Sequence, residues 1–524
     1  MKIFKWLDVT DYNMEFSPSQ EEARIKIRDF LLDGSPKNKL YLLKGSAGTG
    51  KSTLISHILK EEDFREKKIV FSATTNKAVS ILQTMTADKY QGMEVVYFSI
   101  HKLLKIKRKI DKDGKEQFVT NIDRENRNQK KSKSIYYYDI IVIDESSMIN
   151  RDLMRSLHSV LPKIKGKIVF LGDLAQLPPV NEITSSVFTY EIPQYELREI
   201  MRYGGNLVLL ANKCRQLVFY HDTKISFRDF KDKYIRTYKN FELWVQKYLK
   251  DIQKILLKEN VSLEQLPIFL AYTNYRCDEI NKKVRKLLFE NIEAKYMTGE
   301  IIIFNNFYYR PITGKKYYTS QKMKVLQCVT GTYSLTNFIS NLFEIIGKRW
   351  EEVQKEIEFP EDLSFTLTDL ELEYESKFIK IFSNLTEMEL AHQILTLQDG
   401  LEIWVLETQK KDFLDLEIEK VRGQLIKTKK YWLAKYGKQE KIIRNWIMEM
   451  MVMVWEQLYH DILDIFADIS YGYCITTHKS QGSTFNNIFI DLKNIIEKNS
   501  NVEESYRCLY TALTRTSKKV NLLL

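Results

Sequence analysis

The stretch Gly45–Ser52 reads GSAGTGKS and lies between an apolar run, LYLLK at 40–44, and a helical pattern, STLISHILK at 52–60. It fits the pattern GxxxxGK[ST], in which glycines let backbone N–H groups converge on phosphates and a helix N-terminus adds its positive dipole end. The strand–loop–helix context argues against a chance match. The pattern predicts a nucleoside triphosphate site formed by Gly45, Ser46, Ala47, Gly48, Thr49, Gly50, Lys51, Ser52 and Thr53.

Within that loop, Lys51 is expected to reach the β- and γ-phosphates, and the Ser52 hydroxyl is expected to ligate Mg²⁺. The chemistry also needs a carboxylate at the end of another buried strand. IIVIDESS (140–147) supplies Asp144 to hold Mg²⁺ and Glu145 to polarise the attacking water. An acidic pair in this position often only caps the next helix, but the upstream phosphate loop favours the catalytic interpretation.

Short β-rich runs alternate with helical patterns over the first 210 residues, which favours a parallel sheet flanked by helices. The runs IVFSATT (69–75), IIVID (140–144) and KIVFLGD (167–173) are each followed by a polar motif. In open α/β sheets, ligands bind beyond the carboxyl ends of the strands. A second alternating region begins at IFLAYTN (268–274) and closes with NIFIDL (487–492) and the final KVNLLL. The fold class is therefore expected to be α/β.

After another predicted strand, FLGDLAQLPPV (170–180) places Gln176 where its amide could touch the γ-phosphate and a DNA-facing loop. At this point the sequence resembles superfamily 1 helicases, specifically the Dda-like and RecD-like 1B branch. Further stretches resemble the motifs of this branch in the right order, and they are SPSQ (17–20), ATTNKAV (73–79), SIHKLL (99–104), DESS (144–147), LREIMR (197–202), AYTNYRCDEINKKVR (271–285), TTHKSQGST (476–484) and YRCLYTALTRT (506–516).

The resemblance implies two RecA-like motor domains and an ATP- and Mg²⁺-dependent helicase that moves 5′ to 3′ on single-stranded and forked DNA. It implies that Gln20 contacts the adenine base and that Arg202 and Arg515 act as arginine fingers beside Lys51, Glu145 and Gln176. DNA contacts are carried over by motif position to Thr75, Asn76, His101, His478 and Thr484. The resemblance suits a viral or phage enzyme of DNA replication and recombination, with a single-strand binding protein or replisome components as further expected partners.

Two insertions interrupt the motor pattern. Residues 102–133 hold 12 Lys and Arg against five Asp and Glu, which is typical either of a solvated loop or of a basic hairpin on a phosphate backbone. The runs at 300–309 and 322–331 predict a small barrel, and the resemblance implies an SH3-like one. The expected domains are motor 1A (1–101 and 134–210), hairpin 1B, the pin at the fork (102–133), motor 2A (211–300 and 466–524) and a partly helical insertion 2B (301–465).

The net charge of +11 and pI of about 9.0 suggest an anionic partner such as nucleic acid. The five cysteines are scattered without metal-binding spacing, which favours a reducing, intracellular setting, cytoplasmic in a host cell if the protein is viral. The apolar run Trp446–Trp455 contains Glu449 and is too short to cross a bilayer, so it predicts a core helix and no membrane partner. A translocase that displaces bound proteins and an RNA-directed superfamily 1 helicase remain alternatives.

Overall fold

A computed structural model describes residues 15–86, 89–120, 134–201, 205–220, 225–256, 262–289, 292, 294–310, 314–356, 361–437 and 441–524. The chain divides into two compact units. The first contains Met1–Ile106, Thr120–Leu288 and Tyr473–Leu524, and the second contains Lys107–Val119 and Phe289–Gly472. Within the described residues, no helix is long and apolar enough to cross a membrane.

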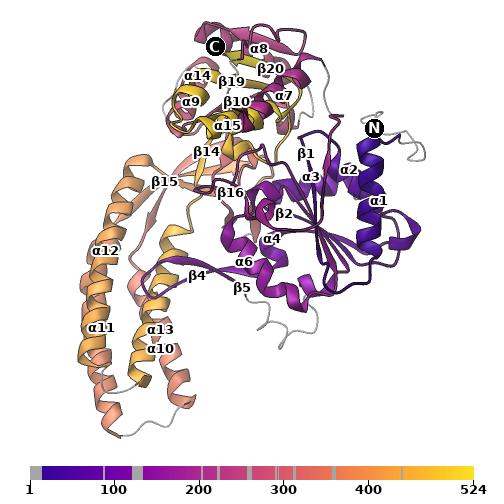
Figure 1. Cartoon of the computed structure of the whole chain (residues 1–524). Coiled ribbons are helices and arrows are strands. Elements are labelled where there is room, and N and C mark those ends of the chain that lie inside the picture. Colours follow the sequence, from indigo (N-terminus) through magenta and orange to yellow (C-terminus); the bar gives the residue numbers. More distant parts are fainter. Residues whose placement is uncertain are drawn as a thin grey trace. The chain divides into compact units, whose positions relative to one another are not determined.

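The first unit holds a six-stranded sheet in the order β3-β2-β6-β7-β1-β8, in which every pair of neighbours is parallel. Figure 1 labels β1 and β2 of this sheet, with helices around them. Its strands are β1 (Leu40–Gly45), β2 (Ile69–Ala73), β3 (Val95–Ser99), β6 (Ile140–Asp144), β7 (Lys167–Gly172) and β8 (Gln194–Leu197). The flanking helices are α1 (Pro18–Leu32), α2 (Lys51–Ile58), α3 (Asn76–Thr86), α4 (Ile100–Leu103) and α6 (Arg151–Val160). The strands predicted at 40–44, 69–75, 140–144 and 167–173 are confirmed.

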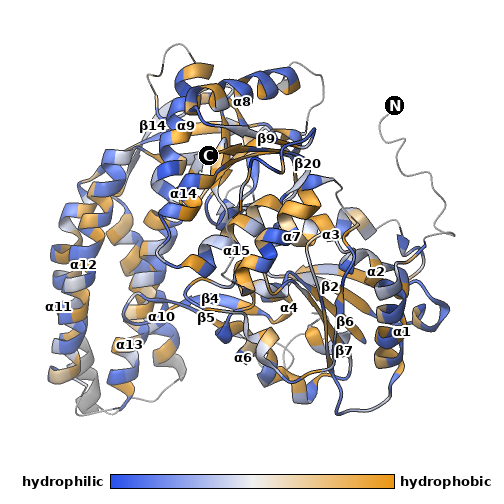
Figure 2. Cartoon of the chain, turned by 45° about the horizontal axis from the view of Figure 1, so that its top comes forward, coloured by the Kyte–Doolittle hydropathy of each residue, from blue (hydrophilic) through white to orange (hydrophobic). Residues whose placement is uncertain are grey.

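Both faces of this sheet are covered, which explains why its strands read as continuous apolar runs. Successive side chains of a strand point to opposite faces. Val142 accordingly packs in one core with Phe71, whereas Ile141 and Ile143 pack in the core on the other face. Figure 2 shows apolar residues concentrated along β2, β6 and β7.

A second parallel sheet in the same unit has the order β18-β10-β19-β20-β9. Its strands are β9 (Ile235–Tyr238), β10 (Ile268–Ala271), β18 (Cys474–Thr476), β19 (Phe485–Asp491) and β20 (Thr516–Leu523). Its helices are α7 (Asn206–Phe219), α8 (Phe241–Leu256), α9 (Asn274–Leu288), α14 (Leu492–Glu497) and α15 (Val502–Leu513). The ring centroids of Trp244 and Tyr248 on α8 lie 4.6 and 4.1 Å from that of Phe269 on β10. The expected α/β fold with two RecA-like motor halves is thereby confirmed.

The second unit contains an antiparallel sheet in the order β16-β15-β14-β11-β17 and a separate two-stranded hairpin, β12–β13. The strands are β11 (Ile301–Phe304), β12 (Tyr308–Arg310), β13 (Lys315–Tyr317), β14 (Lys322–Ser334), β15 (Glu389–Leu397), β16 (Glu402–Leu406) and β17 (Ile469–Tyr471). One core joins the two sheets through Phe304, Tyr308, Tyr317 and Leu395. The predicted domain boundaries and the SH3-like description of this part stay predictions.

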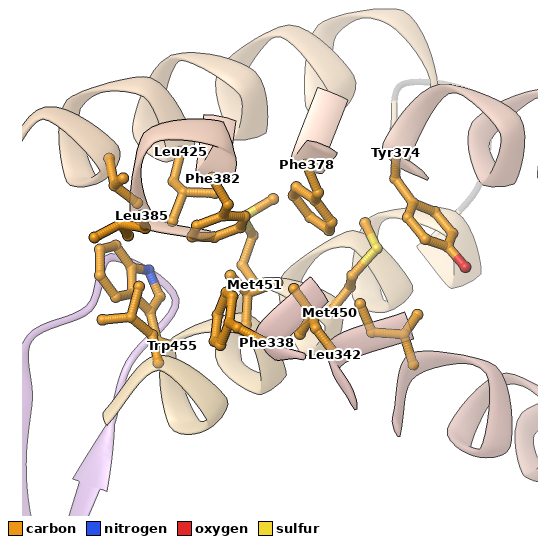
Figure 3. Packing of buried hydrophobic residues seen from close by; sticks show 14 of the residues in the cluster. Phe338, Leu342, Tyr374, Phe378, Phe382, Leu385, Leu425, Met450, Met451 and Trp455 are labelled. Atoms are coloured by element: carbon orange, nitrogen blue, oxygen red, sulfur yellow. The ribbon is translucent and has the colours of Figure 1, made fainter. Parts of the chain in front are cut away.

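Four helices complete the second unit, α10 (Phe338–Glu356), α11 (Glu361–Thr386), α12 (Thr408–Lys435) and α13 (Lys441–Leu458). Each contacts two of the others, α10 with α11 and α13, and α12 with α11 and α13. Figure 3 shows how their apolar side chains interlock, with Phe338, Phe378 and Phe382 facing Met450 and Met451. Met450, Met451 and Trp455 are fully buried. The apolar run at 446–455 is thus a core helix, as predicted.

The basic insertion forms a hairpin of β4 (Ile106–Ile110) and β5 (Glu116–Thr120), and residues 121–133 of the predicted hairpin domain lie outside the described residues. Its turn packs on α12 and α13. Lys429 on α12 donates to the Asp113 carboxylate and, at 3.4 Å, to the Lys112 carbonyl. Gly114 lies against the buried Trp455 indole, beside which the hairpin runs as the purple ribbon of Figure 3.

The strand β4 adds a second attachment near the end of α13. The Arg108 guanidinium forms two hydrogen bonds to the Asp464 carboxylate, at 2.9 and 3.0 Å, and its carbon lies 4.7 Å from the ring centroid of Tyr459. Tyr459 donates its hydroxyl to the Gly114 carbonyl at 3.4 Å. These contacts explain why Lys107–Val119 belongs to the second unit although the chain before and after it belongs to the first.

Candidate active site

The loop after β1 turns sharply to start α2 at Lys51. Gly48 and Gly50 have φ values of 87° and 81°, which non-glycine residues rarely adopt. A Cβ at Gly45 would lie 2.7 Å from the Thr49 hydroxyl, so this position also needs glycine. Lys51 Nζ donates to the carbonyls of Gly45 at 2.8 Å and Ser46 at 3.1 Å. The loop therefore presents an ammonium group and the N-terminus of α2, which suits an anionic ligand.

Two carboxylates follow β6, beside this loop. Ser52 donates its hydroxyl to Asp144 Oδ2 at 2.6 Å, and the Glu145 N–H donates to Asp144 Oδ1 at 2.7 Å. Adjacent hydroxyl and carboxylate oxygens are the ligands that Mg²⁺ takes, so Ser52 and Asp144 fit that ion. Glu145 has a φ of 51°, a left-handed conformation that costs a non-glycine residue about 1–3 kcal/mol and is typical of functional positions.

The two motor halves meet at Gln176 and Arg515. Arg515 precedes β20 in the second half and is only 4% exposed. Its Nη2 donates to Gln176 Oε1 at 3.2 Å, and its Nη1 lies 3.8 Å from Glu145 Oε1. A buried guanidinium needs anionic or acceptor partners. The structure thus brings Arg515 together with Gln176 and Glu145, as the motif positions led us to expect.

Asp173 is a buried member of the site that the sequence analysis did not single out. Its Oδ2 accepts from the Ala47 N–H at 2.9 Å and from the Tyr510 hydroxyl at 2.7 Å. Tyr510 lies on α15 of the second half, so this carboxylate of the first half joins the phosphate loop to the second half. The strand pairing explains its position, because β7 pairs with β1 in parallel and an acid directly after β7 therefore lies beside the loop that follows β1.

Backbone carbonyls of the segment after Asp173 bind the second half directly. Arg507 donates to the Gln176 carbonyl at 3.2 Å and to the Leu174 carbonyl. Gln481 Nε2 donates to the Leu177 carbonyl at 2.9 Å. The segment around Gln176 is therefore held by two separate elements of the second half.

Gln20 lies in the first turn of α1, where Ser17 and Gln20 form a reciprocal capping box. Its Nε2 donates to the Thr49 carbonyl at 2.9 Å, which ties the helix to the phosphate loop. The expected contact with an adenine base stays a prediction. Nearby, the Met201 N–H donates to the Gly48 carbonyl at 2.8 Å, whereas the predicted arginine finger Arg202 lies outside the described residues.

A pocket connects these groups. It is lined by the phosphate loop, by one face of α3, by the carboxylates and Gln176, and by Gly482, Thr484 and Arg515 from the second half. Thr484, which we expected to contact DNA, therefore lies with the nucleotide-site residues. Lys51, Ser52, Asp144, Glu145, Gln176 and Arg515 therefore all border one pocket.

A second pocket lies between the loop 177–183 of the first half and Tyr272, Asn274 and His478 of the second. His478 Nε2 is 3.8 Å from Glu504 Oε1, and Tyr272 donates its hydroxyl to the same oxygen at 3.2 Å. Burial lowers the pKa of His478, and Glu504 opposes this only in part. The neutral imidazole is thus favoured here at neutral pH.

The other residues that we expected to contact DNA are Thr75, Asn76 and His101. Thr75 accepts the Ala78 N–H at 3.2 Å at the start of α3, and a Cβ on Gly482 would lie 3.2 Å from its hydroxyl. Asn76 is the first residue of α3 and is partly exposed. His101 is exposed on α4 and lines neither of the two pockets. Their contact with DNA stays a prediction.

The chain is similar to several known proteins. Residues 32–182 match the family model "AAA domain", and residues 471–523 match "UvrD-like helicase C-terminal domain". The chain is 26% identical over 551 residues to uncharacterized protein R530 of Acanthamoeba polyphaga mimivirus, covering 97% of this chain and 100% of that one. It is 26% identical over 506 residues to the RecBCD enzyme subunit RecD of Buchnera aphidicola, covering 93% and 70%.

Shorter and weaker similarities accompany these. The ATP-dependent DNA helicase PIF1 of Emericella nidulans is 28% identical over 158 residues, covering 28% of this chain and 19% of that protein. A crystal structure of the Pif1 helicase from Candida albicans aligns over 98% of this chain and 95% of its own, with 16% identity and a TM-score of 0.40.

Proposed function

Because the chain belongs to superfamily 1B of the DNA helicases, we propose that it moves 5′ to 3′ along single-stranded DNA and separates the duplex ahead of it. It is an ATP-dependent enzyme, and ATP is its substrate at the loop 45–52. Single-stranded and forked DNA are the proposed nucleic-acid partners. A single-strand binding protein and replisome components are proposed as further partners from the family alone.

The observation that carries the proposal is the meeting of Gln176, Glu145 and Arg515 from two motor halves in one pocket. Lys51 and Arg515 supply positive charge from opposite halves, where the γ-phosphate of ATP would lie. Once hydrolysis removes that anion, the two halves lose their shared partner and the cleft can open. Repeated closing and opening converts each ATP into relative motion of the halves along a strand.

The proposed chemical roles follow from the contacts. Glu145, held in its left-handed conformation at the end of β6, would orient the attacking water and accept its proton. Ser52 and Asp144 would hold Mg²⁺, which neutralises charge on the phosphate oxygens when bound. Asp173 positions the phosphate loop through the Ala47 N–H, and Gln176 transmits the state of the pocket to Arg515.

The ATPase test uses the full-length chain with and without single-stranded DNA. We expect DNA-stimulated hydrolysis that Lys51→Ala abolishes, because the variant loses the ammonium group beside the phosphates. Lys493→Ala, an exposed lysine on α14, is the matched control and should retain full activity. Stimulated hydrolysis that survives in Lys51→Ala would rule out this site.

Two alternatives need assays of their own. An RNA-directed enzyme would unwind a matched RNA duplex at least as fast as the DNA duplex, whereas we expect faster unwinding of DNA. A translocase that strips proteins would displace a tightly bound block yet separate strands poorly. We expect strand separation at a rate comparable to translocation.

A further inference from the structure

The hairpin β12–β13 of the second unit has one buried face and one exposed face. Tyr308 and Tyr317 point inward and pack with Phe304, whose ring centroid is 4.6 Å from that of Tyr317. Strand alternation turns the neighbouring residues outward. Phe307, Tyr309 and Tyr318 are accordingly 53%, 43% and 37% exposed, and Lys316 is also exposed. We call Phe307, Tyr309, Lys316 and Tyr318 the aromatic face.

The strand register brings these four side chains together. Tyr309 and Lys316 are direct cross-strand partners, and Lys316 Nζ lies 5.9 Å from the Tyr309 ring centroid. Continuing the same register places Phe307 opposite Tyr318, and their ring centroids are 5.9 Å apart. The aromatic face is therefore one contiguous surface of three rings and one ammonium group.

The inner face already fills the core, so the outward rings contribute little to the stability of this unit. Large exposed apolar side chains that gather in one place mark an interaction surface, whereas scattered ones do not. None of the motor motifs includes this hairpin. The aromatic face thus needs a function beyond ATP hydrolysis.

The charge around the aromatic face favours an anionic partner. Asp399 accepts from the Tyr317 hydroxyl at 3.1 Å and lies 3.3 Å from Lys315 Nζ, so it is already paired. Asp468 accepts from Asn305 and from Asn306, each at 2.9 Å, and its charge is paired with Lys411, whose Nζ lies 4.0 Å from Asp468 Oδ1. Lys316 is left as the cation that stands among the exposed rings. A partner that combines flat apolar groups with a negative backbone matches this arrangement.

We propose that the aromatic face is an accessory binding surface for single-stranded nucleic acid, outside the motor. Bases would stack on the rings, and Lys316 would contact a phosphate. Stacking of this kind tolerates any sequence because every base has a π-face. The inference rests on the proposed function, since it assigns the accessory surface to the strand on which the motor moves. A proline-rich peptide would also use exposed aromatic rings, but it lacks the phosphates that Lys316 favours.

The test compares binding of the full-length chain to a short strand of about 8 nucleotides and a long strand of about 20, since one stacking module covers about 4–16 nucleotides. The wild type should bind the long strand more tightly. The double variant Phe307→Ala/Tyr318→Ala should lose this length-dependent gain in affinity. Its Kd for the long strand should rise at least about tenfold, while its Kd for the short strand should equal that of the wild type.

Matched variants separate stacking from folding. Phe307→Tyr/Tyr318→Phe keeps both rings and should retain the gain. Phe413→Ala removes a ring that is 51% exposed on α12 and should have no effect. The proposal would be overturned if the double alanine variant bound the long strand more tightly than the short one to the same extent as the wild type. It would also be overturned if the affinity of the wild type rose with an added duplex segment but not with a longer single strand.

Separate measurements test the accessory surface and the ATPase activity of the motor. ATPase activity stimulated by the short strand reports on the proposed function alone, and it should be equal in the wild type and the double alanine variant. If neither protein hydrolyses ATP, the proposed function is wrong. If both hydrolyse ATP and only the length-dependent gain is unaffected, the accessory surface is wrong.

Discussion

Substitution of Gly114 should weaken the docking of the turn between β4 and β5 on Trp455. Gly114 has a φ of 74°, and a Cβ there would lie 2.6 Å from two ring carbons of Trp455. The left-handed conformation costs an alanine about 1–2 kcal/mol. Trp455 is fully buried among the four helices and cannot move aside, so overpacking adds about 1–3 kcal/mol. Gly114→Ala should therefore weaken docking of the turn by about 2–5 kcal/mol.

Gly400 offers a matched control in the same unit. Its φ is 77°, and a Cβ there would meet nothing within 4 Å. Gly400→Ala therefore has the backbone cost without the clash. The difference between the two variants isolates the contact with Trp455, about 1–3 kcal/mol, which corresponds to a shift of about 5–150-fold in the docking equilibrium.

The assay measures single-turnover unwinding of a 5′-tailed fork beside ATPase activity on single-stranded DNA. If the docked hairpin separates strands, Gly114→Ala should slow unwinding about tenfold or more relative to Gly400→Ala, while the ATPase rates of the two variants stay equal. Equal unwinding by the two variants would refute the role of the docked turn. An equal loss of ATPase and unwinding in Gly114→Ala would show that the damage is general.

Three further predictions concern the motor. Asp173→Asn replaces a carboxylate that accepts hydrogen bonds from both Ala47 and Tyr510 with an amide that can direct an N–H group at them, so ATPase activity should fall about tenfold or more. In Tyr510→Phe, ATPase activity should fall less, because the hydrogen bond from Ala47 remains. Arg515→Lys keeps the charge but loses the fork that spans Gln176 and Glu145, so kcat should fall about 10³-fold while affinity for single-stranded DNA, measured by fluorescence anisotropy, is unchanged. Because burial lowers the pKa of His478 in the folded state, its contribution to stability is complete above the unfolded pKa of about 6.5 and is lost as the pH falls through the lower folded value. Between about pH 7 and pH 5, the free energy of unfolding measured with urea should therefore fall less in His478→Gln than in the wild type. An equal fall in both proteins would contradict a lowered pKa of His478.

Much of the motor could be predicted because its signals are local. A glycine-rich turn, a buried apolar strand and an acid at the strand end can each be recognised in a short run of consecutive residues. The sequence therefore predicted the strands β1, β6 and β7 and the positions of Lys51, Asp144 and Glu145. Arg515 and Gln176 are 339 residues apart, and only the family resemblance indicated that they meet.

What the sequence could not predict depends on contacts between distant segments. The basic insertion at 102–133 was expected as a hairpin or a solvated loop, and nothing in the sequence indicated that the turn between β4 and β5 docks on Lys429 and Trp455, more than 300 residues further along the chain. No periodicity in either segment encodes that contact, because it depends on how the four helices pack. Asp173 was missed for a different reason, since its importance appears only once β7 is known to lie beside β1.

We propose that hydrolysis of ATP in the Lys51–Arg515 pocket drives movement in one direction along DNA. The most direct measurement is strand separation by the full-length chain on two forks that are identical except for a single-stranded tail at the 5′ or the 3′ end. We expect ATP-dependent unwinding of the 5′-tailed fork alone, and we expect this unwinding to be lost in Lys51→Ala. Unwinding that requires the 3′ tail, or that persists in Lys51→Ala, would contradict this proposal.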